Sequence, residues 1–173
     1  MAPALNRSLS DLGALLHLVD PTLPIGGFNH SNGLETFVQQ GVVSTKATLE
    51  EYVQTQLLQN WIYNDGAYLS LAFDAMCEGS FDRLCELDWQ LSATKVARES
   101  REGSFKLGVR LLKIFIRYET HTLLTAYQQA IAEKRVQGYF PIVFAMVAQA
   151  MGLSKADTLY ACLLYTSPSP RDY

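Results

Sequence analysis

The sequence predicts an all-α protein, folded as a single compact domain of about eight or nine helices with no sheet. Apolar residues recur every three or four positions along nearly the whole chain, which is the period of an amphipathic helix. No segment sustains the two-residue alternation of a strand. The 173 residues suit one domain, and neither an internal repeat nor a linker divides them.

Capping residues and helix breakers set the boundaries of the helices predicted in the first half of the chain. A serine and an aspartate three positions apart form a capping box, and glycines that tolerate the left-handed conformation end helices. An Asn-Asp-Gly run predicts a turn between two helices. In chain order, the prediction is a helix over 8–19 opened by Ser8 and Asp11, a short helix that stops at Gly41, a helix over 45–63, a turn at 64–66, and a helix closed by Gly79.

The second half of the chain follows the same rules. Its most distinctive element is an apolar helix that begins at Pro141 and ends before Gly152; because it is apolar nearly all round, we expect it at the centre of the fold. The other predicted elements are a helix capped by Ser80, a helix or kinked pair over 95–119 weakened at Gly103, a helix begun by Thr120 or Thr122, and a last helix opened by Ser154 and Asp157.

Cysteine usage and the start of the chain indicate the compartment. The chain has three cysteines, an odd number, and its first residues lack the basic start and apolar run of a secretory signal. No uncharged apolar stretch approaches the roughly 20 residues that span a bilayer. We therefore expect a soluble protein in a reducing, cytoplasmic setting.

The histidines and cysteines do not predict a metal site. None of His17, His30 and His121 lies three to five residues from a cysteine or another histidine, as a zinc site requires. Cys77 and Cys85 are interpreted as small buried hydrophobic residues. No directly bound metal or cofactor is expected.

The sequence also gives only weak indications of a catalytic site. Ser31 lacks the strand-turn-helix setting of a nucleophile elbow. His30 and Glu35 could form an acid-base pair, but their spacing of five residues does not place them on one helix face. A small helical enzyme using this pair is kept as an alternative, and a protein without catalytic activity is predicted.

The first unusual segment is "DPTLPIGGFNHSNGLETF", residues 20–37. Pro21 and Pro24 fix backbone angles, while Gly26 and Gly27 permit positive φ or close approach of another group. From these residues alone, the segment is interpreted as a tight turn between helices, and it lacks the lysine and spacing of a phosphate-binding loop.

The second unusual segment is residues 95–117, which holds seven of the 14 basic residues of the chain. Four of them fall in one helical stripe opposite an apolar face: Lys106, Arg110, Lys113 and Arg117. The stripe is a solvated helix face, a site for an acidic protein, or a nucleic-acid site. Nucleic acid is the least favoured, because the net charge is −3 and no aromatic residue is interleaved with the basic ones.

Taken together, the two segments resemble the UreF family of urease accessory proteins. Family members carry a stretch similar to "LPIGGFNHSNGLE" near their start and a helix similar to "YFPIVFAMVAQAMGLS" later, although Ala145 stands where many members have glycine. The mid-chain motif of the family is matched by Lys95, Arg98, Glu99, Arg101, Ser104, Gly108, Arg110, Leu111 and Leu112.

The resemblance implies a fold, a function and a set of partners. UreF proteins are all-helical and non-enzymatic; they bridge the accessory protein UreD, also called UreH, and the GTPase UreG in the complex that delivers nickel to the urease apoprotein. It further implies a homodimer within the complex, nickel handled by the complex, and no membrane or nucleic acid. Partner binding is expected at Pro24, Gly26, Gly27, Ser31, Gly33, Glu35, Lys95, Arg98, Glu99, Arg101, Ser104, Arg110 and Lys113.

The end of the sequence departs from the family. Family members continue for several tens of residues beyond "YACLLY", with a stretch tied to UreD binding, whereas this chain ends in "TSPSPRDY". We expect a UreF-like domain over 1–165 that is incomplete at its carboxyl end, and an unstructured tail over 166–173 that resembles translated adaptor sequence. UreD binding is thereby put in question. A generic helical adaptor that binds an acidic protein through the basic stripe is the alternative function.

Overall fold

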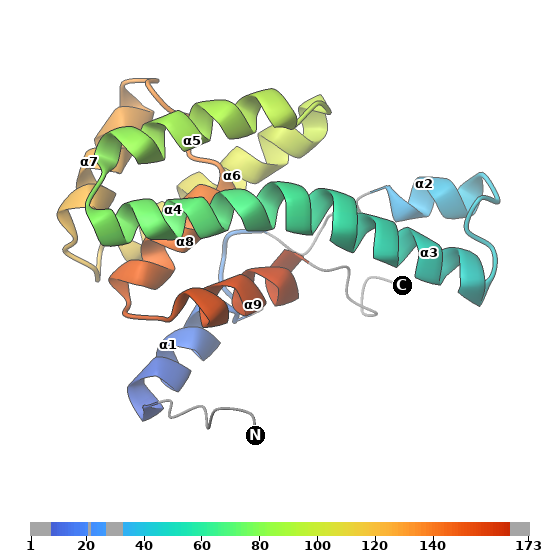
Figure 1. Ribbon diagram of the computed structural model, residues 1–173, viewed down its shortest axis with the longest axis horizontal. Coiled ribbons are helices and arrows are strands. Elements are labelled where there is room, and N and C mark those ends of the chain that lie inside the picture. Colours follow the sequence, from blue (N-terminus) through green and yellow to red (C-terminus); the bar gives the residue numbers. More distant parts are fainter. Residues whose placement is uncertain (1–7, 21, 27–32, 167–173) are drawn as a thin grey trace.

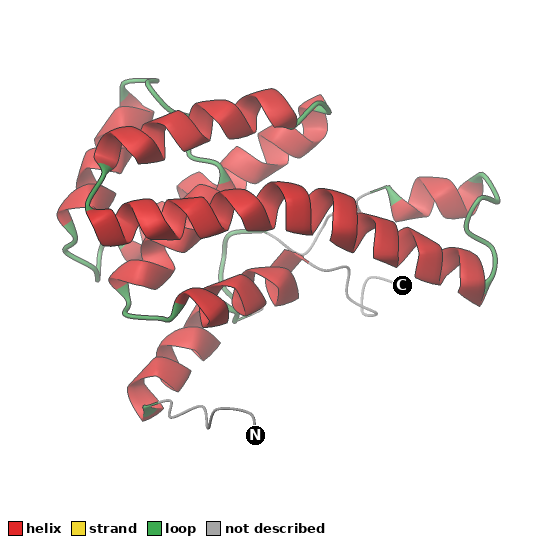
Figure 2. Cartoon of the chain, viewed as in Figure 1, coloured by secondary structure: helices red, strands yellow, loops and turns green. Residues whose placement is uncertain are grey.

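The computed structural model describes residues 8–20, 22–26 and 33–166, and all of its regular elements are helical. Short loops join the helices (Figure 2), and the described residues contain no strand, which confirms the all-α prediction. The elements are α1 (Leu9–Leu18), α2 (Leu34–Gln39), α3 (Lys46–Thr55), the π-helical η2 (Gln56–Gly66), α4 (Ala67–Glu78), α5 (Phe81–Thr94), α6 (Arg98–Phe115), α7 (Thr122–Ala132), α8 (Phe140–Ala150) and α9 (Lys155–Thr166).

Helix α8 is the centre of the core, as its all-round apolar sequence predicts. Residues 140–148 are all buried, and α4 and α6 make the most extensive helix contacts with α8. Figure 1 shows α8 behind α4, with α5 and α6 above and α9 and α1 below. Pro141 occupies the first turn, where its missing N–H costs no helical hydrogen bond.

Side-chain caps open the first and last described helices at the predicted residues. The Ser8 hydroxyl accepts the Asp11 N–H, and the Asp11 carboxylate accepts the Ser8 N–H, each at 3.1 Å. Before α9, the Asp157 N–H donates to the Ser154 hydroxyl at 3.1 Å. Residues 167–173 lie outside the described residues, so the predicted tail stays a prediction.

The predicted turn at 64–66 is wrong, because α3, η2 and α4 form one continuous rod (Figure 1). The turn-forming side chains are used in tertiary contacts instead. Asn64 accepts a hydrogen bond from the Thr94 hydroxyl at 2.9 Å, and Asp65 pairs with Lys95 at 2.7 Å. Gly66 has helical backbone angles, and a Cβ there would lie 2.8 Å from the Trp61 carbonyl oxygen.

Helix α6 is continuous, so the alternative of a kinked pair around Gly103 is wrong. The second glycine of this helix, Gly108, allows α6 to touch the segment that leads into α8. A Cβ on Gly108 would lie 2.1 Å from the Gly138 carbonyl oxygen and 2.9 Å from the Phe140 nitrogen. Close packing therefore explains why glycine stands inside this helix.

The cysteines only partly follow the prediction that they act as buried hydrophobic residues. Cys77 is exposed on α4, which contradicts it, because Cys77 lies on the solvent side of a helix whose opposite face packs on α8. Cys85 is half-buried on α5, where desolvation raises the pKa of its thiol. Cys162 is buried in α9, and burial raises its pKa far above the ordinary value. None of the described helices is long and apolar enough to cross a membrane.

Candidate functional site

The described part of the proline- and glycine-rich segment is a turn anchored by two apolar side chains. Leu23 and Ile25 are buried in the core, whereas Pro24 and Gly26 face solvent between and after them. Asp20 accepts hydrogen bonds from the hydroxyl and the N–H of Thr22, both at 2.7 Å, and these bonds lower the pKa of its carboxyl. The sequence thus fixes the turn from inside and leaves its outer residues free for contact.

Arg110 joins this turn to α6. Its guanidinium donates a hydrogen bond to the Ile25 carbonyl oxygen at 3.0 Å, across 85 positions of sequence. Gly26 has φ +80°, and a Cβ there would lie 2.8 Å from the Arg110 Nη1 atom. The two segments that the sequence singles out separately therefore form one surface, and Arg110 has a positioning role within it.

Helix α2 follows the undescribed residues 27–32 and lies beside α3, where the Phe37 and Tyr52 rings are 5.7 Å apart. Gly33, with φ +90°, is the N-cap residue immediately before α2, and Glu35 is exposed in the first turn of the helix. A carboxylate at this end is favoured by the partial positive charge of the helix N-terminus. Gly27, His30 and Ser31 lie outside the described residues, so their predicted roles stay predictions.

Two of the basic residues expected to bind a partner are engaged within the chain. The Lys95 ammonium pairs with Asp65 at 2.7 Å, and its side chain is only 10% exposed. The Arg101 guanidinium donates to the carbonyl oxygens of Lys95 and Val96, each at 2.8 Å. Both side chains fix the loop between α5 and α6, a structural role that the sequence reasoning did not assign to them.

On the exposed side of α6, three charged side chains one turn apart form a ladder of two ion pairs. Glu102 accepts from Arg98 at 2.7 Å and from Lys106 at 3.2 Å, and the hydrogen bond from Arg98 is the main reason that the pKa of Glu102 is lowered. Glu99 is exposed beside this ladder. Lys113 is exposed further along α6, and no described residue forms an ion pair with it.

Ser104 faces inward, so it serves packing rather than the exposed surface. Its hydroxyl accepts the Phe140 N–H at 3.3 Å, next to the contact of Gly108 with the same segment. Of the mid-chain motif, Ser104 and Gly108 therefore hold α6 against the start of α8. Arg98, Glu99 and Lys113 remain on the outside.

A buried carboxylate missed by the sequence reasoning organises the other end of this packing. Asp88 is 1% exposed and accepts hydrogen bonds from the Tyr127 hydroxyl at 2.7 Å and from the N–H groups of residues 137–139 at 2.7 to 3.1 Å. Its sequence signal is its place on the apolar face of α5, four residues after Leu84. Burial, aided by the Asp88 charge, raises the pKa of Tyr127 well above its usual value.

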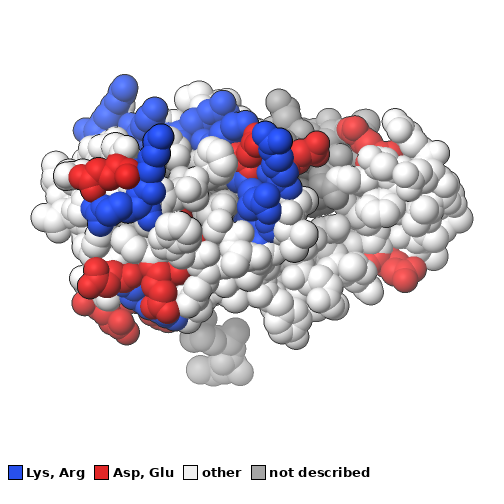
Figure 3. Space-filling view, turned by 90° about the horizontal axis from the view of Figure 1, so that it is seen from above, with Lys and Arg blue, Asp and Glu red and all other residues white. Residues whose placement is uncertain are grey.

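Positive charge gathers over one part of the molecule. Residues 98–135 hold eight basic and four acidic side chains, although the whole chain has a net charge of −3. In Figure 3, most of the visible Lys and Arg side chains lie over the half that contains α5 and α6, interspersed with Asp and Glu, whereas the half with α2 and α3 shows mainly uncharged and some acidic side chains. Among the described residues, no group of three or more His, Cys, Asp or Glu side chains could hold a metal ion.

The fold and this surface define a class of protein: a helical domain in which a proline- and glycine-rich turn is fixed by an arginine to a basic helix. Comparison with known proteins identifies the class. The family model UreF matches residues 43–167 of the chain. The chain belongs to the UreF family of urease accessory proteins, which confirms the resemblance inferred from its motifs.

Individual relatives span a wide range of identity. The urease accessory protein UreF of Haemophilus influenzae strain KW20 is 96% identical over 161 residues, which are 93% of this chain and 68% of the relative. UreF of Actinobacillus pleuropneumoniae serotype 5b is 79% identical over 88% of this chain and 67% of its own length. UreF of Lachnoclostridium phytofermentans is 36% identical over 86% of this chain and 65% of its own length.

Proposed function

We propose that this chain is a non-catalytic scaffold that bridges UreD, or UreH, and the GTPase UreG in the complex that matures urease. The observation that carries the proposal is the contact of Arg110 with Ile25, which joins the two family motifs into one surface. On this proposal the protein works in the cytoplasm, as a homodimer within the complex, and nickel is the cargo of the assembly on its way to the urease apoprotein.

The surface proposed for partner binding combines the turn with the exposed side of α6. Pro24 and Gly26 are exposed on the turn, and Glu35 is exposed on α2. Arg98 and Lys113 are exposed on the helix side, where their positive charge favours carboxylates on the GTPase. A surface made from a rigid turn and long side chains gives a partner both shape and charge to recognise.

The test is co-elution of this chain with UreD and UreG from the same source on size exclusion. A ternary peak is expected if the chain bridges them. Because the chain spans 68% of the H. influenzae relative, full-length UreF is run in parallel. A peak only with full-length UreF would assign UreD binding to the part that the chain lacks, and failure of both proteins would overturn the proposal.

A pair of matched variants tests the surface. Glu35→Lys reverses a charge in the first turn of α2, and Glu51→Lys makes the same change on the exposed side of α3. Glu35→Lys is expected to reduce the ternary peak, whereas Glu51→Lys is expected to leave it unchanged. If both variants changed the ternary peak to the same extent, Glu35 would not belong to the proposed surface.

A further inference from the structure

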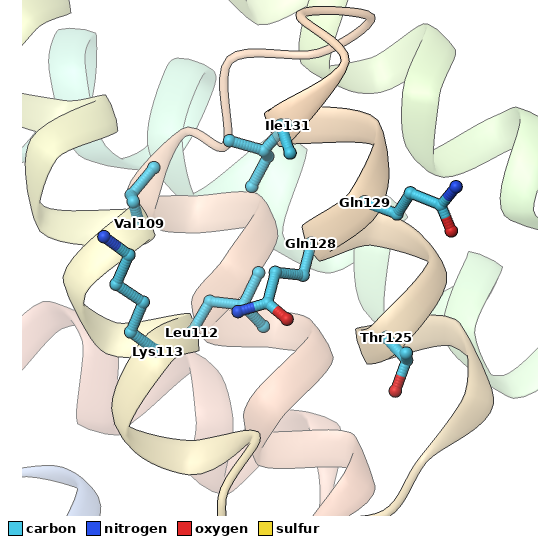
Figure 4. A pocket seen from close by; sticks show the side chains of 8 residues that line it. Val109, Leu112, Lys113, Thr125, Gln128, Gln129 and Ile131 are labelled. Atoms are coloured by element: carbon cyan, nitrogen blue, oxygen red, sulfur yellow. The ribbon is translucent and has the colours of Figure 1, made fainter.

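A groove between α6 and α7 borders the surface described above and shares Lys113 with it. It has a volume of about 480 Å³ and is lined by Val109, Leu112, Lys113, Thr125, Gln128, Gln129, Ile131 and Ala132. Figure 4 shows Leu112 at its centre between the two helices, with Val109 and Ile131 toward one end. Its floor is therefore apolar, and both helices contribute to it.

Two polar groups on the groove have no partner among the described residues. Gln128 extends from α7 toward α6 beside Leu112 (Figure 4), and its side-chain amide makes no hydrogen bond with a described residue. Lys113 runs along the α6 side, and its ammonium forms no ion pair with a described residue. By contrast, Gln129 points away from α6 in Figure 4 and donates to Glu133.

The charge around the groove is positive. Arg117, exposed in the turn that follows α6, has no ion-pair partner in the described chain. At the other end, Glu133 is neutralised by Arg135 at 2.7 Å. An occupant with carboxylates at its edge would find unpaired cations, whereas a basic occupant would be repelled.

We propose that the α6–α7 groove binds an acidic amphipathic helix of a protein partner. Apolar side chains of that helix enter between Val109, Leu112 and Ile131, and its flanking carboxylates meet Lys113 and Arg117. The side-chain amide of Gln128 forms a hydrogen bond with a polar group in the middle of the bound helix.

The shape of the groove fits a helix. Its α6 lining runs from Val109 to Lys113 and its α7 lining from Thr125 to Ala132, so each wall is one to two helical turns long. An amphipathic helix presents apolar anchors at i, i+3 or i+4, and i+7, which matches a floor of this length. Lys113 belongs to both the groove and the proposed partner surface, but the proposal does not depend on the bridging function, because it needs only a helix of this chemistry and neither UreD nor UreG.

The experiment uses the 173-residue chain, labelled at its Ile, Leu and Val methyl groups, and two synthetic 18-residue helical peptides. Both peptides carry leucine at helical spacing; one has glutamate and the other lysine at the flanking positions. The acidic peptide is expected to shift the methyl signals of Val109, Leu112 and Ile131 and to bind at least tenfold more tightly than the basic one. Equal binding of both peptides, shifts centred elsewhere, or no binding to the folded chain would overturn the proposal.

Three variants assign the binding to the groove. The double variant Lys113→Glu/Arg117→Glu is expected to weaken binding of the acidic peptide at least tenfold. Gln128→Glu is expected to weaken the same binding several-fold. Lys46→Glu, the same charge change at a 90% exposed side chain on α3, is the control and should alter binding less than twofold. Methyl spectra show whether each variant is folded, and folded groove variants that bind as tightly as the parent chain would contradict the assignment.

Discussion

The hydroxyl of Tyr127 donates a 2.7 Å hydrogen bond to the carboxylate of Asp88, and both side chains are buried. Tyr127 belongs to α7 and Asp88 to α5, and the same carboxylate receives the N–H groups of residues 137–139. One acidic side chain thus holds two helices and the segment that leads into the central helix α8.

Replacing Asp88 should destabilise the fold strongly. Asp88→Ala leaves a buried hydroxyl and three buried or half-buried N–H groups without their acceptor, and we expect a loss of about 3 kcal/mol or more in the free energy of unfolding. Urea titration measures the loss. Glu86→Ala, an exposed carboxylate on the same helix, is the control and should cost less than about 1 kcal/mol; a similar cost for both variants would contradict the role of Asp88.

Tyr127 should make the chain sensitive to high pH. Because burial raises its pKa in the folded state, the unfolded state loses the phenolic proton first, and stability falls as the pH rises above about 10. The contribution is about 1.4 kcal/mol per pH unit until the folded pKa is reached. Urea titrations between pH 8 and 11 should show this slope on top of the one from the buried Cys162 thiol; Tyr127→Phe should reduce the total slope, and the 74% exposed Tyr118, changed to Phe, should leave it in place.

The three thiols should react with a disulfide reagent at different rates. Cys77 is exposed and is expected to react first, whereas burial and a raised pKa protect Cys162 until the chain unfolds. Absorbance of the released thiolate at pH 8 follows the reaction. Cys77→Ser should remove the fast phase, and a fast phase that survives in this variant would show that Cys77 is shielded.

The contact between α6 and the start of α8 should not accept a methyl group. Gly108→Ala places a Cβ 2.1 Å from the Gly138 carbonyl oxygen, so backbone must move, and we expect a loss of about 3 kcal/mol. Gly13→Ala in α1 is the matched control, because nothing lies within 4 Å of its Cβ and alanine favours the helix. Thermal unfolding should show Gly13→Ala to be stabilising by about 0.5 to 1 kcal/mol and Gly108→Ala to be strongly destabilising.

The fold class and most helix ends could be predicted, because periodicity and capping act over a few residues. Ser8, Pro141 and Ser154 are local signals, and the structure uses each of them as predicted. The turn at 64–66 was predicted wrongly for the same reason. A local rule cannot include the Thr94 and Lys95 side chains, which lie some 30 positions away and bind Asn64 and Asp65 inside a helix.

The candidate site was predictable as two motifs but not as one surface. Arg110 looks like any member of a basic stripe until the chain brings Ile25 beside it. Lys95 and Arg101 have the same charge and nearly the same spacing as their neighbours, yet they point into the structure and fix a loop. Sequence spacing gives the side of a helix, whereas the partner of each long side chain depends on what packs against that side.

The rod formed by α3, η2 and α4 runs from Lys46 to Glu78 without a break. It is held at one end only, because α4 packs on α8 whereas α3 has no buried residue. The α3 end of the rod therefore projects from the packed body of the protein. Because no loop interrupts the rod, any displacement of α3 at Lys46 has to pass to α4 through the π-helical turns of η2.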